Sequence, residues 1–381
     1  FKGQCVPFSN VNIRKAVDAL FNEPYDGPIV TNQRIYERLT LGISLPQAVG
    51  GDTKSFTLHY VDWEHPERNV FHVTEEFEVE RRGSHPSKRS GTRRPDLVCF
   101  VNGIPFVIIE CKRPDLATQS GEQAVEQAVS QMLRNQKLDE IPDLFIYSQM
   151  LLAVSENAAL HATTGTEKKF WAVWKEEDLD ETALTSLANT PLTAAQKDHL
   201  YNWRKYASQV RAYFDTQDAA CATTPRLITA QDRVLYALLR PARLLELTNR
   251  FIVYDGGKKK IARYQQYFAV KATLERVAHL DVRGQRRGGV IWHTTGSGKS
   301  LTMVMLAKGL ALHPNLRNPR VAIVTDRVDL DLQIWNTFKA CGKKVMQAAS
   351  GKDLGKLPVS YTHLRAHETV LDLVCRLLLE K

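Results

Sequence analysis

Residues 94–112, RPDLVCFVNGIPFVIIECK, decide the fold of the first part of this chain. Two apolar runs, 97–101 and 104–111, flank the dipeptide Asn102-Gly103. Apolar runs joined by Asn-Gly are a strong short-range signal of a β-hairpin, because both turn residues tolerate the positive φ angles of a tight turn. The stretch therefore predicts two buried antiparallel strands.

Three ionisable residues lie at the open end of this hairpin. Asp96 precedes the first run, Glu110 lies near the end of the second, and Lys112 follows it. Glu110 and Lys112 are two residues apart and so share one face of a strand. Two carboxylates brought together bind a hard cation such as Mg²⁺, which polarises a phosphate and acidifies a bound water. A lysine beside them can orient that water and offset developing charge. We predict a magnesium-dependent phosphodiester-hydrolysing site from Asp96, Glu110 and Lys112; solvated charges at a strand edge are the alternative.

The register of the hairpin provides a check on this site. A two-residue turn would pair Asp96 with Ile109 and leave it on the face opposite Glu110. A shared face requires a three-residue loop over residues 102–104, or a β-bulge. We predict the three-residue loop, or an Asp96 that reaches round from the strand end. Carboxylates more than about 8 Å apart would exclude the site, since each ligand lies about 2 Å from one Mg²⁺.

The remainder of the first part mixes strands and helices. Apolar and polar residues alternate over 71–79, which predicts a half-buried strand, and a charged loop follows at 81–94. Residues 121–135 predict a helix, and the apolar stretch 144–154 predicts a strand.

A polar region at 176–245 is predicted to be a helical connector. Its helical pattern is interrupted at Thr190-Pro191 and Thr224-Pro225, because the residue before a proline is disfavoured in a helix. We expect a second domain from about residue 246.

A phosphate-binding loop marks this second domain. Residues 294–300, TTGSGKS, follow the apolar run 289–293, a predicted strand, and lead into a predicted helix at 299–312. Glycines let backbone N–H groups close around phosphates, and a helix N-terminus favours an anion. The lysine of such a loop reaches the β- and γ-phosphates, and the following hydroxyl binds Mg²⁺. The residues predicted to hold ATP are Thr295, Gly296, Ser297, Gly298, Lys299 and Ser300, with Ser300 also on the metal.

Strand and helix continue to alternate after the loop. Residues 321–325 predict a strand and 329–340 a helix, so the second domain is expected to contain a parallel α/β sheet. The whole chain is therefore assigned to the α/β class.

The motifs resemble one known family. Residues 94–112 are very similar to the signature of the R subunit of type I restriction-modification enzymes, and residues 35–42, 61–69 and 165–175 are similar to it as well. Its Pro-Asp and Glu-x-Lys elements are those of PD-(D/E)xK nucleases.

The resemblance and the sequence pattern together divide the chain into four segments. They are an endonuclease domain with a mixed sheet flanked by helices at 1–175, the connector at 176–245, a partial RecA-like ATPase lobe at 246–358, and a tail.

The resemblance also implies roles for further residues. Gln131 corresponds to the glutamine of a Gln-x-x-x-Tyr motif that supports the nuclease site, although Asn135 stands where tyrosine is usual. His293 replaces a loop glycine, as in superfamily 2 helicase-like motors. Gln266 corresponds to an adenine-contacting glutamine, with a capping or surface role as the alternative. Residues 325–330 resemble motif Ia, which contacts the DNA backbone.

The family function is expected to be cleavage of double-stranded DNA with Mg²⁺, coupled to ATP-driven translocation. The implied partners are a methylase subunit, which uses S-adenosylmethionine, and a specificity subunit, in the cytoplasm of a prokaryote. Two alternatives remain open: a stand-alone nuclease-helicase of DNA repair, and a non-catalytic module that binds DNA and nucleotide.

Bulk properties agree with a DNA partner. The formal net charge is +9 with a pI near 9.2, and a basic excess suits a polyanion. We find no apolar run of about 18 residues, so no membrane span is predicted. The six cysteines are scattered without metal spacing, as expected of reduced thiols.

Neither end of the sequence is expected to be a natural terminus. The first residue is Phe1, so we expect residues to be missing before it. Residues 359–369 and 372–381 back-translate onto two consecutive segments of a sequencing-library adapter, and 359–381 is predicted to be read-through. We see no Walker B motif, second motor lobe or arginine finger, so the chain as written is expected not to hydrolyse ATP at a meaningful rate.

Overall fold

A computed structural model of the chain describes residues 6–83, 91–113, 121–176, 179–202, 206–282, 284–316, 319, 321–325, 328–347 and 373–374. The tip of the predicted charged loop, residues 326–327 of the motif Ia segment and most of the predicted adapter segment therefore lie outside the described residues.

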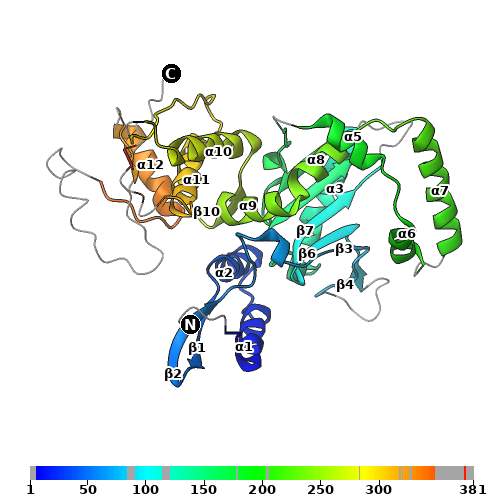
Figure 1. Cartoon of the computed structure of the whole chain (residues 1–381), viewed down its shortest axis with the longest axis horizontal. Helices are drawn as coiled ribbons and strands as arrows, with labels where there is room; N and C mark the ends of the chain where they lie inside the picture. Colours follow the sequence, from blue (N-terminus) through cyan, green and yellow to red (C-terminus); the bar gives the residue numbers. More distant parts are fainter. Residues whose placement is uncertain are drawn as a thin grey trace.

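A five-stranded mixed sheet forms the centre of the first part of the chain (Figure 1). The strand order is β3-β6-β7-β8-β9; β7 and β8 run parallel and the other neighbours antiparallel. These strands are β3 (Phe71–Glu75), β6 (Leu97–Val101), β7 (Ile104–Cys111), β8 (Met150–Ser155) and β9 (Ala158–Ala162). The predicted hairpin and the α/β class with a mixed sheet are confirmed.

Helix α3 (Gly121–Asn135) covers one face of this sheet, and its bounds are those predicted from the sequence. Val125 and Val129 on its apolar side pack with Ile108 of β7 and Leu151 of β8. An apolar stripe that recurs every three to four residues buries one side of a helix and leaves the other polar. The outer side of α3 is therefore free to form part of a site.

The opposite face of the sheet belongs to a larger core that reaches into the second part of the chain. Val107 and Leu152 of the sheet and Leu245, Tyr267 and Val304 from later helices are members of this one cluster. The sheet and the phosphate-loop region thus share buried apolar surface, which stabilises both.

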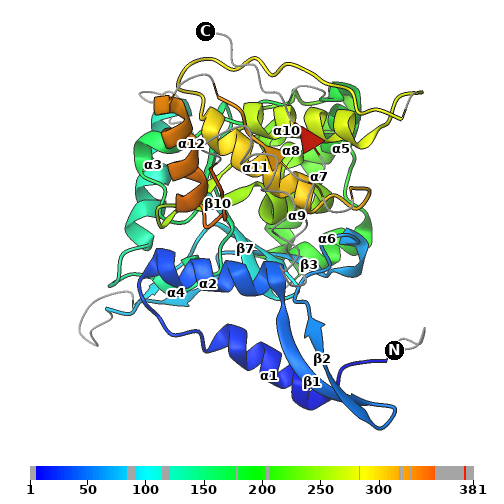
Figure 2. The ribbon, with the colours of Figure 1, turned by 90° about the vertical axis from the view of Figure 1, so that its left-hand side faces the viewer.

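The N-terminal elements lie beside the sheet (Figure 2). They are α1 (Asn10–Phe21), α2 (Pro28–Leu41) and the hairpin of β1 (Ile43–Val49) and β2 (Asp52–Leu58). Short elements complete this part: η1 (Pro66–Arg68), β4 (Val79–Glu80), β5 (Thr92–Arg93), α4 (Pro142–Phe145) and η2 (Lys168–Phe170).

Two sequence predictions in this part need correction. The alternation at 71–79 is not one strand, because Glu76 has a φ of 47° and ends β3. The strand predicted at 144–154 begins only at Met150, since Pro142 starts the short helix α4. Proline at the first helical position loses no intrahelical hydrogen bond and favours a helix start.

The connector is helical, as predicted. It contains α5 (Glu181–Ala188), α6 (Ala194–Tyr201), α7 (Ala207–Thr223), α8 (Ala230–Leu239) and the start of α9 (Pro241–Phe251). Pro191 and Pro225 both fall between helices. Residue 246, the predicted start of the second domain, lies inside α9.

The last part contains β10 (Ile252–Asp255), β11 (Lys258–Ile261), α10 (Tyr264–Ala278), α11 (Lys299–Ala311) and α12 (Val328–Ala340). Helices α11 and α12 confirm the two predicted there. The strand predicted at 289–293 is wrong: these residues have no strand partner, and Val290 and Trp292 are exposed. Only Val321–Ala322 of the strand predicted at 321–325 is extended; this strand, β12, pairs in parallel with β13 (Leu373–Val374).

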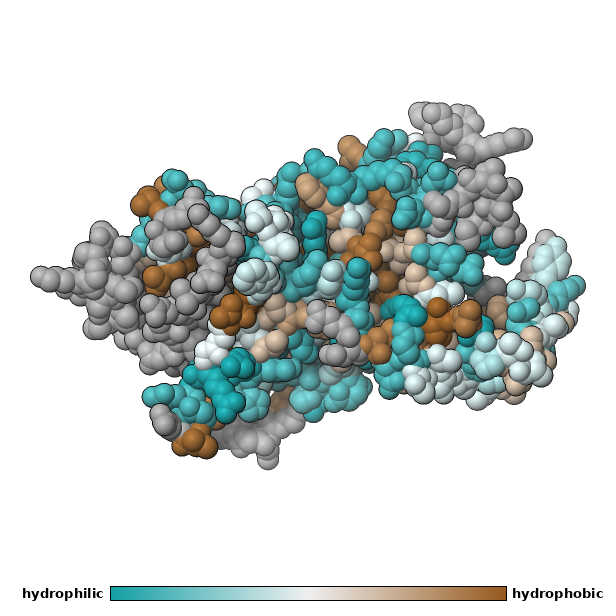
Figure 3. Space-filling view, turned by 90° about the horizontal axis from the view of Figure 1, so that it is seen from above, coloured by the Kyte–Doolittle hydropathy of each residue, from teal (hydrophilic) through white to brown (hydrophobic). Residues whose placement is uncertain are grey.

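The surface seen in Figure 3 is largely hydrophilic, with hydrophobic side chains in scattered groups. Within the described part of the chain, no helix combines the length and apolar character needed to cross a membrane.

A buried polar junction joins the phosphate-loop helix to the N-terminal elements. Lys308 of α11 donates from Nζ to the Tyr36 hydroxyl at 2.6 Å and to the Ile252 carbonyl at 3.1 Å. The Tyr36 hydroxyl in turn donates to the Thr248 carbonyl at 2.9 Å. Burial lowers the pKa of Lys308 to about 7. The hydroxyl of Tyr36 therefore satisfies groups from α9 and α11 at once.

A second lysine, Lys259, also lies over the ring of Tyr36, with Nζ 5.6 Å from the ring centroid. Lys259 of β11 is 3% exposed and donates from Nζ to the Ser148 carbonyl at 3.0 Å and to Gln149 Oε1 at 2.7 Å, just before β8. Asn32 donates to the same Ser148 carbonyl and accepts from Tyr254. Buried polar groups of this kind are costly unless fully paired, so the junction requires each of its members.

We expect Tyr36→Phe to lower the free energy of unfolding by about 1–3 kcal/mol. The ring stays in place, but the buried groups that bond to the Tyr36 hydroxyl each lose a hydrogen bond. Urea denaturation followed by circular dichroism measures this. Tyr213→Phe, which changes an exposed tyrosine on α7, is the matched control. A Tyr36→Phe protein as stable as the wild type would contradict a structural role for the junction.

Candidate functional site

The hairpin of β6 and β7 sets the position of Asp96 relative to Glu110. Val101 pairs with Ile104 across a two-residue turn, in which Asn102 and Gly103 have φ angles of 50° and 80°. The predicted three-residue loop is therefore wrong.

A β-bulge restores the shared face. Cys99 pairs with Val107 but Phe100 pairs with Pro105, so Phe106 is the extra residue in β7. The local chemistry favours this place, because Pro105 has no N–H to donate to the ladder and the Phe106 side chain is fully buried. Beyond the bulge Leu97 pairs with Ile109, which brings Asp96 opposite Glu110. The bulge that the sequence allowed as an alternative is confirmed.

The three predicted nuclease residues meet at the end of β7. Asp96 Oδ2 accepts a hydrogen bond from the Cys111 N–H at 2.7 Å. Lys112 Nζ lies 2.8 Å from Glu110 Oε1 and 4.0 Å from Asp96 Oδ2. One ammonium group thus faces both carboxylates, which reduces the repulsion between them.

Glu110 is the most confined member of this group. It is 1% exposed, and its Oε2 atom is buried with no hydrogen-bond partner. Burial raises the pKa of Glu110 to about 7; the neighbouring charge of Asp96 raises it further, and Lys112 opposes the shift.

An unpaired buried carboxylate oxygen is costly and calls for a partner. Asp96 and Glu110 suit a divalent cation such as Mg²⁺ chemically, because both side chains offer the hard oxygen atoms that such a cation prefers.

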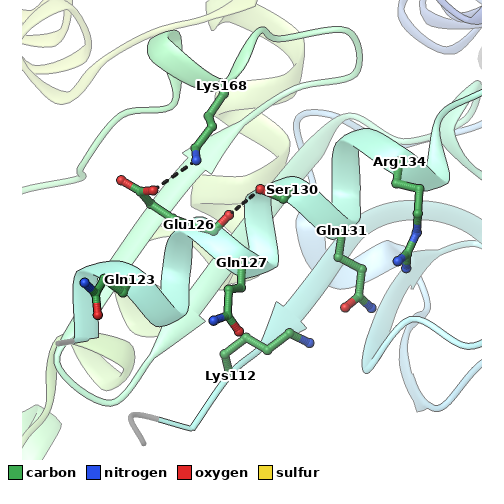
Figure 4. A pocket seen from close by; sticks show the side chains of 8 residues that line it. All are labelled: Lys112, Gln123, Glu126, Gln127, Ser130, Gln131, Arg134 and Lys168. Carbon is green, nitrogen blue, oxygen red and sulfur yellow. Dashed lines mark hydrogen bonds and ion pairs between the residues drawn. The ribbon is translucent and has the colours of Figure 1, made fainter. Parts of the chain in front are cut away.

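Gln131 lies in a groove over the outer side of α3 (Figure 4). In the figure, Lys112 extends along the groove on the side towards which Gln131 points. Asn135, the last residue of α3, is buried and does not line the groove. The groove, called here the α3 groove, is lined by Lys112, Gln123, Glu126, Gln127, Ser130, Gln131, Arg134 and Lys168.

Sequence reasoning overlooked most of this lining. The signal was available in part, because glutamines recur at 123, 127 and 131, the spacing of one side of a helix. Exposed glutamines carry no distinctive chemistry, however, until the fold places them beside Lys112.

The phosphate loop reaches the N-terminus of α11 as predicted. Gly296 and Gly298 have φ angles of 80° and 85°, which favour glycine. Ser297 bonds back to the Thr294 carbonyl through its N–H and its hydroxyl, which tightens the turn. Lys299 and Ser300 then open the helix, where backbone N–H groups without intrahelical partners can meet an anion.

Gln266 connects the phosphate loop to the start of α10 by two hydrogen bonds. Its Oε1 accepts from the Arg263 N–H at 2.9 Å, which caps α10, and its Nε2 donates to the Gly298 carbonyl at 3.2 Å. The capping role considered as an alternative is present, while its contact with adenine stays a prediction. Burial and the charge of Lys299 lower the pKa of His293 at the start of the loop.

No cluster of three His, Cys, Asp or Glu side chains suited to a metal is present in the described part of the chain. Among the same residues, Cys99, Cys111, Cys221 and Cys341 are free thiols. Asp96 and Glu110 are a pair and do not make such a cluster, so their binding of Mg²⁺ stays a prediction.

Two family models match this chain. Residues 4–170 match the family model of the type I restriction enzyme R protein N terminus, and residues 265–369 match that of the SWI2/SNF2 ATPase. The chain belongs to the type I restriction enzyme R protein family, as the resemblance implied.

Several curated relatives carry matching names. The chain is 30% identical over 334 residues to the HindI endonuclease subunit of Haemophilus influenzae, covering 86% of this chain and 26% of that protein. It is 28% identical over 330 residues to a putative MjaIXP endonuclease subunit of Methanocaldococcus jannaschii, covering 84% and 28%. The SauCOLORF180P endonuclease subunit of Staphylococcus aureus is 23% identical over 294 residues, covering 77% and 24%. The chain spans about a quarter of the length of these relatives.

The buried carboxyl predicts a pH dependence of stability. The pKa of Glu110 is about 7 in the folded chain against 4.5 ordinarily. The contribution of Glu110 to the free energy of unfolding is therefore full below pH 4.5 and is lost as the pH rises through 7. In EDTA, Glu110→Gln should therefore gain stability over the wild type at pH 8, by on the order of 3 kcal/mol at most, and much less at pH 5. Thermal melts at both pH values measure the difference. Equal shifts at the two pH values would show that Glu110 does not titrate as described.

Proposed function

We propose that the chain cleaves double-stranded DNA by Mg²⁺-dependent phosphodiester hydrolysis. The observation that carries the proposal is the convergence of Asp96, Glu110 and Lys112, with the Oε2 atom of Glu110 buried and unpaired. A structural ion pair would not need the second carboxylate, and it would not leave an oxygen without a partner.

Each residue has a distinct part in the proposed reaction. Asp96 and Glu110 would hold Mg²⁺, which when bound polarises the scissile phosphate and acidifies water. Lys112, which already donates to Glu110, orients the attacking water and offsets charge on the phosphate. Gln131 lines the same groove and supports the substrate or the water there.

The phosphate loop supplies the second activity. We propose that residues 295–300 bind the phosphates of ATP, with Lys299 on the β- and γ-phosphates and Ser300 on the accompanying Mg²⁺. Gln266 holds the Gly298 carbonyl and so fixes the loop. In the full-length protein this site would drive DNA translocation.

The names of the relatives, all endonuclease subunits, support a multisubunit enzyme. We propose that the protein is the R subunit of a type I site-specific deoxyribonuclease in the prokaryotic cytoplasm. It would act with a specificity subunit and with a methylase subunit that uses S-adenosylmethionine.

Nicking of supercoiled plasmid in Mg²⁺ tests the nuclease. Asp96→Asn, Glu110→Gln and Lys112→Ala should each reduce the rate at least about 100-fold, since each removes a metal ligand or a charge-stabilising group. Asp52→Asn and Lys54→Ala on β2 make the same chemical changes away from the site and should leave the rate unchanged. EDTA should abolish nicking in every variant.

Two outcomes separate this proposal from its alternatives. A wild-type chain that binds DNA in a salt-sensitive way but never nicks it would indicate a non-catalytic module. Full activity of the full-length protein without methylase and specificity subunits would favour a stand-alone nuclease-helicase.

Gly298→Ala should weaken ATP binding more than tenfold. The position has a φ of +85°, and a Cβ there would meet Gln266 Nε2 at 2.7 Å, so the loop must move. Gly284→Ala also places alanine at a positive φ, but nothing lies within 4 Å of its Cβ, and it serves as the control. Titration of a fluorescent ATP analogue measures both; unchanged affinity in Gly298→Ala would contradict the assigned loop.

A further inference from the structure

The α3 groove has two rows of side chains that differ in charge. The row nearer Lys112 contains Gln123, Gln127 and Gln131, and Arg134 lies at its end (Figure 4). Residues four apart on a helix advance by about 6 Å and stay on one side, so these glutamines form a line parallel to the helix axis.

The other row lies on the side of Lys168. Glu126, the one carboxylate among the described residues of the groove, pairs with Lys168 at 2.9 Å, and Ser130 donates to the Glu126 backbone carbonyl oxygen at 2.8 Å. The acidic charge of the groove is thereby neutralised within this row. The row nearer Lys112 carries amides and one guanidinium, with no carboxylate among its members.

This composition selects a class of ligand. No apolar side chain is among the described residues that line the groove, so these residues offer nothing to a hydrophobic ligand. Amide and guanidinium groups are frequent donors to DNA phosphates, and contacts to phosphates position the duplex without reading its sequence. The groove also includes Lys112, so a strand lying in it would continue into the cleavage site.

We propose that Gln123, Gln127 and Arg134 form a track that holds the phosphate backbone of the cleaved strand next to Lys112. The inference rests on the proposed nuclease function and extends it to residues outside the catalytic group. The track contributes mainly neutral hydrogen bonds, so it positions the strand, while Arg134 supplies an ionic contact at the end of the groove. Specific sequence is not read here.

The structure keeps the track straight. Val125, Ala128 and Val129 on the inner side of α3 are buried against the sheet that carries Glu110. The helix cannot rotate without exposing this apolar surface, so the track and the carboxylates are held by one rigid unit. A strand bound along the track therefore has a defined height above the metal site.

Binding of a short fluorescein-labelled duplex in EDTA tests the track without cleavage. The double variant Gln123→Ala, Gln127→Ala should raise Kd about tenfold or more, with the slope of log K against log salt unchanged, because only neutral donors are lost. Arg134→Ala should also raise Kd and should reduce that slope by about one. With Mg²⁺, both proteins should show a raised KM and a nearly unchanged kcat at saturating DNA.

A matched control changes two glutamines elsewhere. The double variant Gln209→Ala, Gln217→Ala on α7 should bind as the wild type does. Alanine is a better helix former than glutamine, so none of these changes should unfold its helix, which circular dichroism checks.

Two failures are distinguishable. Wild-type affinity in the Gln123→Ala, Gln127→Ala protein, or no duplex binding by the wild type at low salt, would overturn the track. If the track variants bind weakly as expected but the wild type never cleaves, then the track stands and the proposed nuclease function falls.

Discussion

The extra residue in β7, Phe106, is the constraint on which the proposed nuclease site depends. It shifts the ladder by one residue, so Asp96 lies opposite Glu110 instead of Ile109. A shift of one residue moves a side chain to the other face of a sheet. Without the bulge, Lys112 and Glu110 would face a different neighbour, and the two carboxylates could not share one cation.

A buried carboxylate in the central strand must be held by its surroundings. Glu110 lies in β7 between β6 and β8, and the start of β8 is secured by the hydrogen bonds that Lys259 and Asn32 donate near Ser148. Those residues belong to the junction that also carries Lys308 from the phosphate-loop helix. The sheet and the phosphate loop are therefore parts of one packed structure.

The sequence predicted those parts of the fold that have strong local signals. Helices α3, α11 and α12 follow from periodicity, and Asn102-Gly103 marks the hairpin. The bulge was only an option, because it depends on Pro105 lacking an N–H and on the burial of Phe106. The strand at 289–293 failed since an apolar run needs a partner strand to pair with. The outer residues of α3 were missed because their meaning comes from their neighbours in space.

A crystal structure of the chain soaked with Mn²⁺, which accepts the same oxygen ligands as Mg²⁺, tests the shared cation site of Asp96 and Glu110 most directly. We predict an anomalous peak within about 2.2 Å of one carboxylate oxygen from Asp96 and one from Glu110, with Phe106 as the unpaired residue of β7. A peak bound by only one of these carboxylates, or an Asp96 on the opposite face of the sheet, would contradict it.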